Sequence, residues 1–245
     1  MKSLGFAARN AKEMLRDKLT LIFGIGFPVI LLLLLSLIQS NIPVELFAIE
    51  HLTPGIVVFG FSFISLFSAL VIAKDRSGSF MLRLLTSPMR AVDFIIGYTL
   101  PLIPMVVAQS AVCFLVAYFL GLKLSANILL CMVVLLPSGV VFIALGLLSG
   151  SIFNDKQVGG ICGALLTNLS AWLSGTWFDL GLVGGVFEAV AMALPFARAV
   201  EAGRAALSGN YGGIMPHLVW VIAWAALLYA AAVLVFTRKM RGDSK

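Results

Sequence analysis

The amino-acid sequence predicts an all-α, polytopic integral membrane protein with six transmembrane helices, an N-terminal amphipathic interfacial helix and a re-entrant outer helix pair before the last span. The first observation behind this is composition. Among 245 residues, 61% are hydrophobic, 11% are charged, and the mean hydropathy is +1.07. A typical soluble domain has about 25% charged residues. So few charges cannot cover a soluble fold of this length, which excludes a soluble enzyme, a disordered chain and a nucleic-acid-binding module.

The second observation is the length of the apolar runs. A bilayer core about 30 Å thick needs about 20 apolar residues in a helix. One apolar stretch, at 180–197, is interrupted by glycines and Pro195 and is too short to span the bilayer. Because irregular backbone at membrane depth must be covered by protein, this stretch favours a re-entrant or interfacial helix pair over a span, and we assign 178–215 to the re-entrant and outer segment. Six runs are long enough to span, at 19–38, 53–73, 94–120, 127–150, 158–176 and 217–237.

The third observation is the distribution of basic residues. With the N-terminus in the cytoplasm and six alternating spans, all but three of the 17 Lys and Arg residues face inward, the exceptions being Lys123, Arg198 and Arg204. The positive-inside rule therefore predicts that both termini are cytoplasmic. We expect a single multi-pass transmembrane domain, 1–245, in the cell membrane. The long first apolar run, with no A-x-A-like site after it, favours an uncleaved span over a signal peptide.

Residues 1–18 form the predicted N-terminal helix. Apolar residues recur on one side at helical spacing, and charged residues occupy the other, a pattern that favours an amphipathic helix in the interface over a plain basic flank. The apolar stripe comprises Leu4, Ala7, Ala8, Ala11, Met14 and Leu15, and the charged side comprises Arg9, Lys12, Glu13, Arg16 and Asp17.

Residues 74–91 form the longest cytoplasmic connection between spans. Phe80 lies four residues before Leu84, and Met81 lies four before Leu85, which places both pairs on one surface of a short helix. Pro88 ends that helix. The residues alone leave two interpretations open: a helix lying passively at the interface, or a docking element for a cytoplasmic protein.

The sequence lacks the motifs of a self-contained enzyme or pump. It has no G-x-x-x-x-G-K-[ST] phosphate loop and no H-E-x-x-H zinc motif, and its two histidines, His51 and His217, lie at outer ends of spans. We therefore expect no catalytic residue and no metal site. The spans also lack the buried carboxylates of a proton-coupled carrier or cation channel, so the energy source is expected in another chain. A self-contained secondary carrier or channel is the alternative, and an intramembrane enzyme is a second rival.

Two motifs carry a resemblance to a known family. Residues 75–97 and 195–209 resemble the cytoplasmic loop and the outer motif of ABC-2 type permeases, the membrane subunits of one class of ATP-binding-cassette exporters. Pro54-Gly55-Ile56 resembles the family's entry to the second span, whereas Tyr98 stands where a lysine is common. The matching positions are Asp75, Arg76, Phe80, Leu85, Pro88 and Gly97 in the loop, and Pro195, Phe196, Val200, Glu201, Arg204 and Gly209 in the outer motif.

The resemblance implies a half-transporter. A second permease copy would pair with this chain, in a homodimer or a heterodimer, and separate nucleotide-binding subunits would carry ATP and Mg²⁺, so no cofactor is expected here. Residues 1–18 would be the connecting helix, with Arg9, Lys12 and Arg16, and 74–91 the coupling loop. The implied docking residues are Asp75, Arg76, Phe80, Met81, Arg83, Leu84 and Pro88, with Asp155 and Lys156 as a minor second contact.

Aromatic residues suggest a substrate path. Phe59 and Phe63 on the second span, with Trp172 and Trp177 on the fifth, could line an apolar route, although core or lipid-facing packing is the commoner role of such residues. Pro195, Glu201 and Arg204 are expected to be structural at the outer side. The expected function is outward movement of an amphipathic substrate (a drug, lipid or lipid-linked compound), with membrane lipid as the surrounding partner and no nucleic acid involved.

Overall fold

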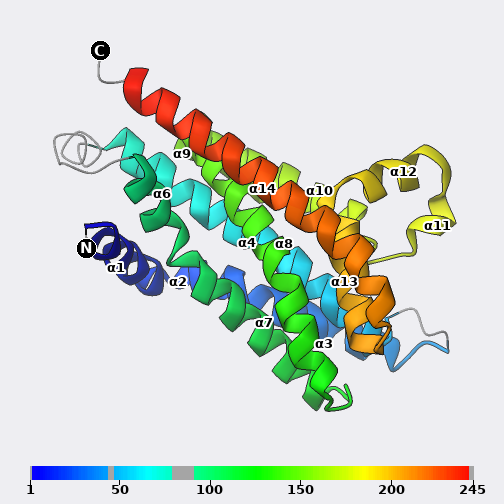
Figure 1. The fold of residues 1–245 in the computed structure, drawn as a ribbon. Helices are drawn as coiled ribbons and strands as arrows, with labels where there is room; N and C mark the ends of the chain where they lie inside the picture. Colours follow the sequence, from blue (N-terminus) through cyan, green and yellow to red (C-terminus); the bar gives the residue numbers. More distant parts are fainter. Residues whose placement is uncertain (1, 44–46, 79–90, 243–245) are drawn as a thin grey trace.

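The structure is a computed structural model that describes residues 2–43, 47–78 and 91–242. Over these ranges the chain is helical and contains no strand, which confirms the all-α prediction (Figure 1). In chain order the elements are α1 (Lys2–Arg16), α2 (Lys18–Leu21), the π-helix η1 (Ile22–Gly26), α3 (Phe27–Gln39), α4 (Ile49–Ser77), α6 (Ala91–Thr99), α7 (Leu102–Phe119), α8 (Ala126–Ile152), α9 (Asp155–Val158), the π-helix η2 (Gly159–Leu166), α10 (Thr167–Leu173), α11 (Leu180–Val183), α12 (Gly185–Ala193), α13 (Pro195–Ser208) and α14 (Tyr211–Gly242).

Within the described residues, five helices are long and apolar enough to cross a membrane. They coincide with five of the six predicted spans. The remaining span, predicted at 158–176, is helical over 155–173 but is not one of the five, because that helix includes the polar residues Lys156, Gln157 and Asn168. Its crossing stays a prediction. The five helices are Lys18–Gln39, Ile49–Ser77, Val92–Phe119, Ala126–Ile152 and Tyr211–Lys239.

Helix α4 is the most enclosed of these five, with 83% of its most apolar window buried inside the fold. It packs against α3, α7, α8, α13 and η2. Glycines let α8 approach it closely: a Cβ at Gly146 would lie 2.5 Å from the carbonyl oxygen of Ser65, and one at Gly150 would lie 2.6 Å from that of Ala69. Small residues permit such backbone contact between membrane helices.

The predicted re-entrant pair corresponds to two short helices, α11 and α12, which project from the bundle before α13 begins (Figure 1). Gly184 and Gly185, with φ values of 64° and 58°, make the turn between them in a conformation that favours glycine. Pro195 then occupies the first turn of α13, where it needs no amide hydrogen. Whether the pair enters the membrane stays a prediction.

The N-terminal helix is present, but the side that faces the protein differs from the predicted stripe. Phe6, Ala7, Asn10 and Met14 are buried, whereas Leu4, Ala8 and Leu15 are exposed. The prediction placed six apolar residues on one side of α1 and did not include Phe6. In the fold, the aromatic ring of Phe6 determines which side packs on α6, and Asn10 is buried with it because its amide finds a backbone partner.

Candidate functional site

At the end of the bundle that the sequence predicts to be the inner, cytoplasmic one, α1, α6 and α14 meet. The ring of Phe6 packs edge-on against Tyr98 at 4.9 Å and against Phe94 at 5.9 Å, measured between centroids. Phe94 in turn lies 6.2 Å from Phe236 near the end of α14. Gly97 makes room for this packing, because a Cβ there would overlap the Phe6 ring.

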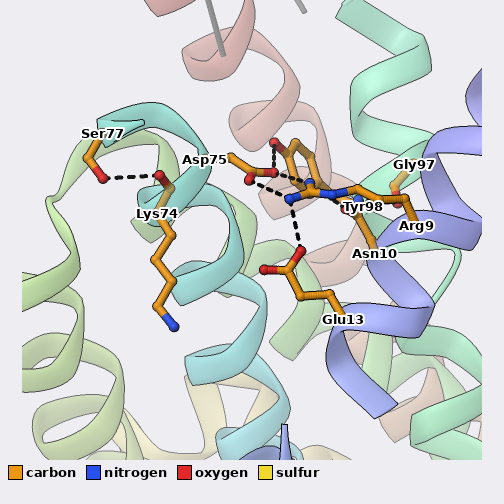
Figure 2. Close-up of polar contacts among 8 residues, drawn as sticks. All are labelled: Arg9, Asn10, Glu13, Lys74, Asp75, Ser77, Gly97 and Tyr98. Atoms are coloured by element: carbon orange, nitrogen blue, oxygen red, sulfur yellow. Dashed lines mark hydrogen bonds and ion pairs between the residues drawn. The ribbon is translucent and has the colours of Figure 1, made fainter. Parts of the chain in front are cut away.

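A buried carboxylate lies at the centre of the same region, at the end of α4 (Figure 2). Both oxygens of Asp75 accept hydrogen bonds from the Arg9 guanidinium, at 2.9 and 3.2 Å, and the Tyr98 hydroxyl donates a third at 3.0 Å. The Asp75 side chain is only 6% exposed. A buried charge is costly unless it is paired and hydrogen-bonded, and here the three donors compensate it.

Asn10 extends this cluster to the α6 backbone. Its side-chain amide donates to the carbonyl oxygen of Gly97 at 3.0 Å and accepts from Arg9 at 3.0 Å, and Arg9 also pairs with Glu13 at 2.9 Å (Figure 2). Burial alone would lower the pKa of Arg9, but the contacts with Asp75 and Glu13 outweigh it and raise the pKa. The guanidinium therefore keeps its charge. We call Arg9, Asn10, Asp75, Gly97 and Tyr98 the inner junction.

The inner junction holds both flanks of the predicted coupling loop. Asp75 stands at the end of α4, just before the loop, and Gly97 and Tyr98 stand on α6, just after it. Helix α1 binds both flanks through Arg9 and Asn10. The neighbouring residue Arg76 donates to the carbonyl oxygen of Gly150 at 2.9 Å and so ties the same end of α4 to α8. The two flanks are therefore linked to α1 and α8 as well as to each other.

The predicted docking residues fall into three groups. Asp75 and Arg76 lie in intramolecular contacts, with Asp75 buried, so the described surface does not offer the Asp75 carboxylate to a partner. Asp155 and Lys156 are exposed in the first turn of α9, whose start is fixed by an Asn154 capping box. Lys12 and Arg16 of the connecting helix are also exposed. Phe80, Met81, Arg83, Leu84 and Pro88 lie outside the described residues.

The predicted path residues are only partly brought together. Phe59 contacts Phe63 at 5.8 Å and Trp177 at 5.5 Å, with edge-on rings in both pairs. Two residues that were not predicted, Phe23 and Phe27, extend this row, since Phe63 lies 5.2 Å from Phe27 and 6.2 Å from Phe23. Trp172 is 59% exposed and makes no ring contact with these residues. We call Phe23, Phe27, Phe59, Phe63 and Trp177 the aromatic row.

A second polar cluster lies at the opposite end of α4. The Arg204 guanidinium on α13 donates to the carbonyl oxygens of His51 at 3.2 Å and Gly175 at 2.8 Å, and pairs with Glu201 at 2.8 Å. It thus joins α13 to the first turn of α4 and to the turn after α10. We call His51, Gly175, Glu201 and Arg204 the outer clamp. A cavity of about 680 Å³ adjoins it, and its lining includes Glu50, Trp177, Glu188, Glu201, Arg204 and His217.

The corner between α12 and α13 is fixed by side chains of α13 and α14. Arg198 donates to the carbonyl oxygen of Met192 at 3.0 Å. The indole nitrogens of Trp220 and Trp224 both donate to the carbonyl oxygen of Ala193, at 3.0 and 3.1 Å. These bonds occupy carbonyls that the end of a helix leaves without an intrahelical partner.

Sequence reasoning missed Asn10 and Tyr98 as parts of the inner junction, and Phe6 as the ring that packs beside it. Tyr98 was noticed only as a departure from the family pattern, and its place directly after the motif glycine Gly97 was the available signal. Asn10 gave no signal, because a polar residue on an amphipathic helix is ordinarily assigned to the solvated side.

The comparisons with known proteins bear on the whole bundle. No curated protein matches the chain. The family model described as ABC-2 type transporter matches residues 5–208, which contain the inner junction, the aromatic row and the outer clamp. Members of this family are membrane permeases rather than catalysts, and they normally work with an ABC ATPase subunit. With its apolar helices and this match, the chain is a multi-pass membrane protein that belongs to the ABC-2 type transporter family.

Proposed function

We propose that this chain is the permease subunit of an ABC exporter that moves an amphipathic substrate outward, while a separate subunit binds and hydrolyses ATP with Mg²⁺. The observation that carries the proposal is the inner junction. A buried Asp75 on one flank of the loop is held by Arg9 of the connecting helix and by Tyr98 on the other flank. This arrangement suits a loop that must transmit force from a partner.

The proposal revises the role of Asp75. Its buried carboxylate is suited to positioning the flanks of the loop rather than to contacting the ATPase. Direct docking then belongs to the loop residues Phe80, Met81, Arg83, Leu84 and Pro88, with Asp155 and Lys156 as the second contact.

Helix α4 supplies the route from the ATPase side to the exit. Its inner end belongs to the inner junction, and its outer end is held by the outer clamp through the His51 carbonyl. Displacement of α4 by the loop would strain the Arg204 bonds and open the outer end. The aromatic row, which contains Phe59 and Phe63 of α4, lines the proposed substrate route, and the cavity beside the clamp is its outer vestibule.

The proposed architecture has six spans, cytoplasmic termini and a second permease copy. One feature supports a crossing by 155–173. The start of α1 and the end of α14 lie at the same end of the bundle (Figure 1), as the contacts from Phe6 through Phe94 to Phe236 also require. Five crossings would leave them at opposite ends. α11 and α12 are proposed to form the re-entrant pair near the exit.

The test is co-purification of the full chain with ABC ATPase subunits from the same genome. We expect a stable complex, which Arg83→Glu combined with Phe80→Ala weakens, whereas Lys123→Glu in an outer loop does not. A complex that forms equally well with the double variant would refute docking through the loop. Transport by the purified chain without any ATPase would instead support a self-contained carrier or channel.

A further inference from the structure

Helix α1 has three sides rather than two. One side, with Phe6, Asn10 and Met14, is buried against α6. A second side carries Leu4, Ala8, Ala11 and Leu15, spaced four, three and four residues apart, and its two leucines are 59% and 68% exposed. We call these four residues the apolar strip. Protein contacts within the described chain therefore leave this side open.

The third side of α1 is basic. It is an open surface beside the apolar strip, formed by residues of α1 alone. Three basic side chains and one acidic side chain line it, so its net charge is positive. The lining residues are Gly5, Ala8, Arg9, Lys12, Glu13 and Arg16, of which Ala8 also belongs to the apolar strip.

The position of α1 fixes the depth of both sides relative to the bilayer. Asp17 ends α1 and caps the next helix by accepting from the Leu19 amide at 3.1 Å. The first membrane-spanning helix begins at Lys18. Since α1 ends directly before that helix, it must lie at the level of the headgroups, with exposed leucines continuing into the span at Leu19. Apolar area beside basic side chains at this depth is typical of helices that bind anionic lipid surfaces.

We infer that α1 binds an anionic phospholipid of the inner leaflet, with the acyl chains on the apolar strip and the headgroup phosphate at Lys12 and Arg16. The inference rests on the proposed function only for the assignment of α1 to the inner leaflet. Its consequence is regulatory. Because Arg9 and Asn10 on the same helix hold the inner junction, lipid bound to α1 biases the position of the coupling-loop flanks.

The first experiment measures contact with lipid on the full chain in nanodiscs. A fluorophore on Leu15→Cys is expected to be quenched strongly by acyl-chain quencher lipids. The same probe on Glu13→Cys, from the basic side, is expected to be quenched weakly, and the wild-type chain gives the background of its three buried cysteines. Equal quenching at both positions overturns the inference. So does loss of Leu15→Cys quenching when the ATPase binds, because the ATPase would then cover the strip.

The second experiment measures headgroup preference by native mass spectrometry. The wild-type chain is expected to retain phosphatidylglycerol over phosphatidylcholine. Lys12→Gln and Arg16→Gln should each weaken phosphatidylglycerol binding about fivefold, since each basic side chain near a membrane surface contributes about 1 kcal/mol. Lys12→Arg keeps the charge and should retain binding, and Lys123→Gln in an outer loop is the matched control. Unchanged binding in the Gln variants, or competition by inorganic phosphate alone, overturns the inference. The comparison of Leu15→Cys with Glu13→Cys and the headgroup measurement both work without the ATPase, so their failure leaves the proposed transport function separately testable.

Discussion

At the scale of single residues, Asp75 shows how a charge near the membrane is used. A carboxylate this buried is tolerated because Arg9 donates twice and Tyr98 once. Pairs of this kind add little net stability compared with apolar packing, yet the loss of one partner leaves an uncompensated charge. Single substitutions in the inner junction are therefore expected to lower the stability of the fold much more than substitutions of both partners.

Arg9→Gln should lower the free energy of unfolding by about 1–3 kcal/mol, because it leaves the buried Asp75 carboxylate without its counter-charge. The cost stays below that of a fully buried pair because the Arg9 side chain is 37% exposed. Thermal unfolding of the purified chain in detergent measures it. The double variant Arg9→Gln with Asp75→Asn should recover part of the loss, and Glu13→Gln, on the exposed rim, is the control. Additive losses in the double variant would contradict the coupling.

At the outer end of α4, Arg204 holds several polar partners, as Arg9 does at the inner end. Its planar guanidinium reaches two carbonyls and a carboxylate at once, which a lysine ammonium on a flexible stem reproduces poorly. Arg204→Lys should therefore increase thiol labelling of a reporter at Ser174→Cys, a buried position beside Gly175, and lower the unfolding temperature. Lys123→Arg serves as the control. Labelling that is unchanged by Arg204→Lys would show that the clamp does not hold the outer end closed.

At the scale of elements, two glycines set the distance between helices. The Gly97 site decides how closely α1 can pack on α6, because a Cβ would collide with Phe6. Gly150 does the same for α8 against α4. Overpacking such contacts typically costs about 1–3 kcal/mol.

Gly97→Ala should detach α1 from α6 without unfolding the bundle. Hydrogen exchange in residues 6–14 is expected to accelerate while exchange in α4 and α8 stays slow. Gly5→Ala, where nothing lies within 4 Å of the new methyl group, is the matched control and should leave α1 protected. Protection of α1 in the Gly97 variant would mean that Phe6 can move aside at no cost.

Gly150→Ala should destabilise the whole bundle, because the methyl group would lie 2.6 Å from a carbonyl oxygen of the central helix. Gly160→Ala meets no atom within 4 Å and should be neutral. Unfolding temperatures of the two variants, compared in the same detergent, measure the difference. Equal temperatures would argue that α4 and α8 can separate freely.

At the scale of the whole molecule, the question is how often the chain crosses the bilayer. Six crossings place Lys123 and Ser208 outside and Asn154 inside. A membrane-impermeant thiol reagent applied to intact cells should therefore label Lys123→Cys and Ser208→Cys, and leave Asn154→Cys unlabelled until the cells are opened. Labelling of Lys123→Cys without Ser208→Cys would show that 155–173 does not cross.

The helices were the most predictable part of this molecule, because spanning runs such as 53–73 and 127–150 are uniform in composition and long. The side of α1 that packs on α6 was not predictable. Helical spacing places Leu4 and Met14 on an apolar side, but it does not tell which of them faces α6. Asp75, Arg76 and Arg204 were picked out through the family motifs, although Asp75 was assigned to partner contact. Their partners Arg9, Gly150 and His51 are distant in sequence, and only the fold brings them together.

The bonds at the two ends of α4 also set a threshold for motion. The bonds to Asp75 and from Arg204 have lengths of 2.8–3.2 Å. Hydrogen bonds of this kind weaken steeply once the donor and acceptor separate by about another 0.5 Å. Under the proposed function, an axial shift of α4 that lengthens these bonds to about 3.6 Å would release both ends together, whereas a smaller shift would leave them engaged. A permease built in this way would not leak in proportion to small movements of α4. It would stay closed until α4 moves far enough to break the bonds at both ends.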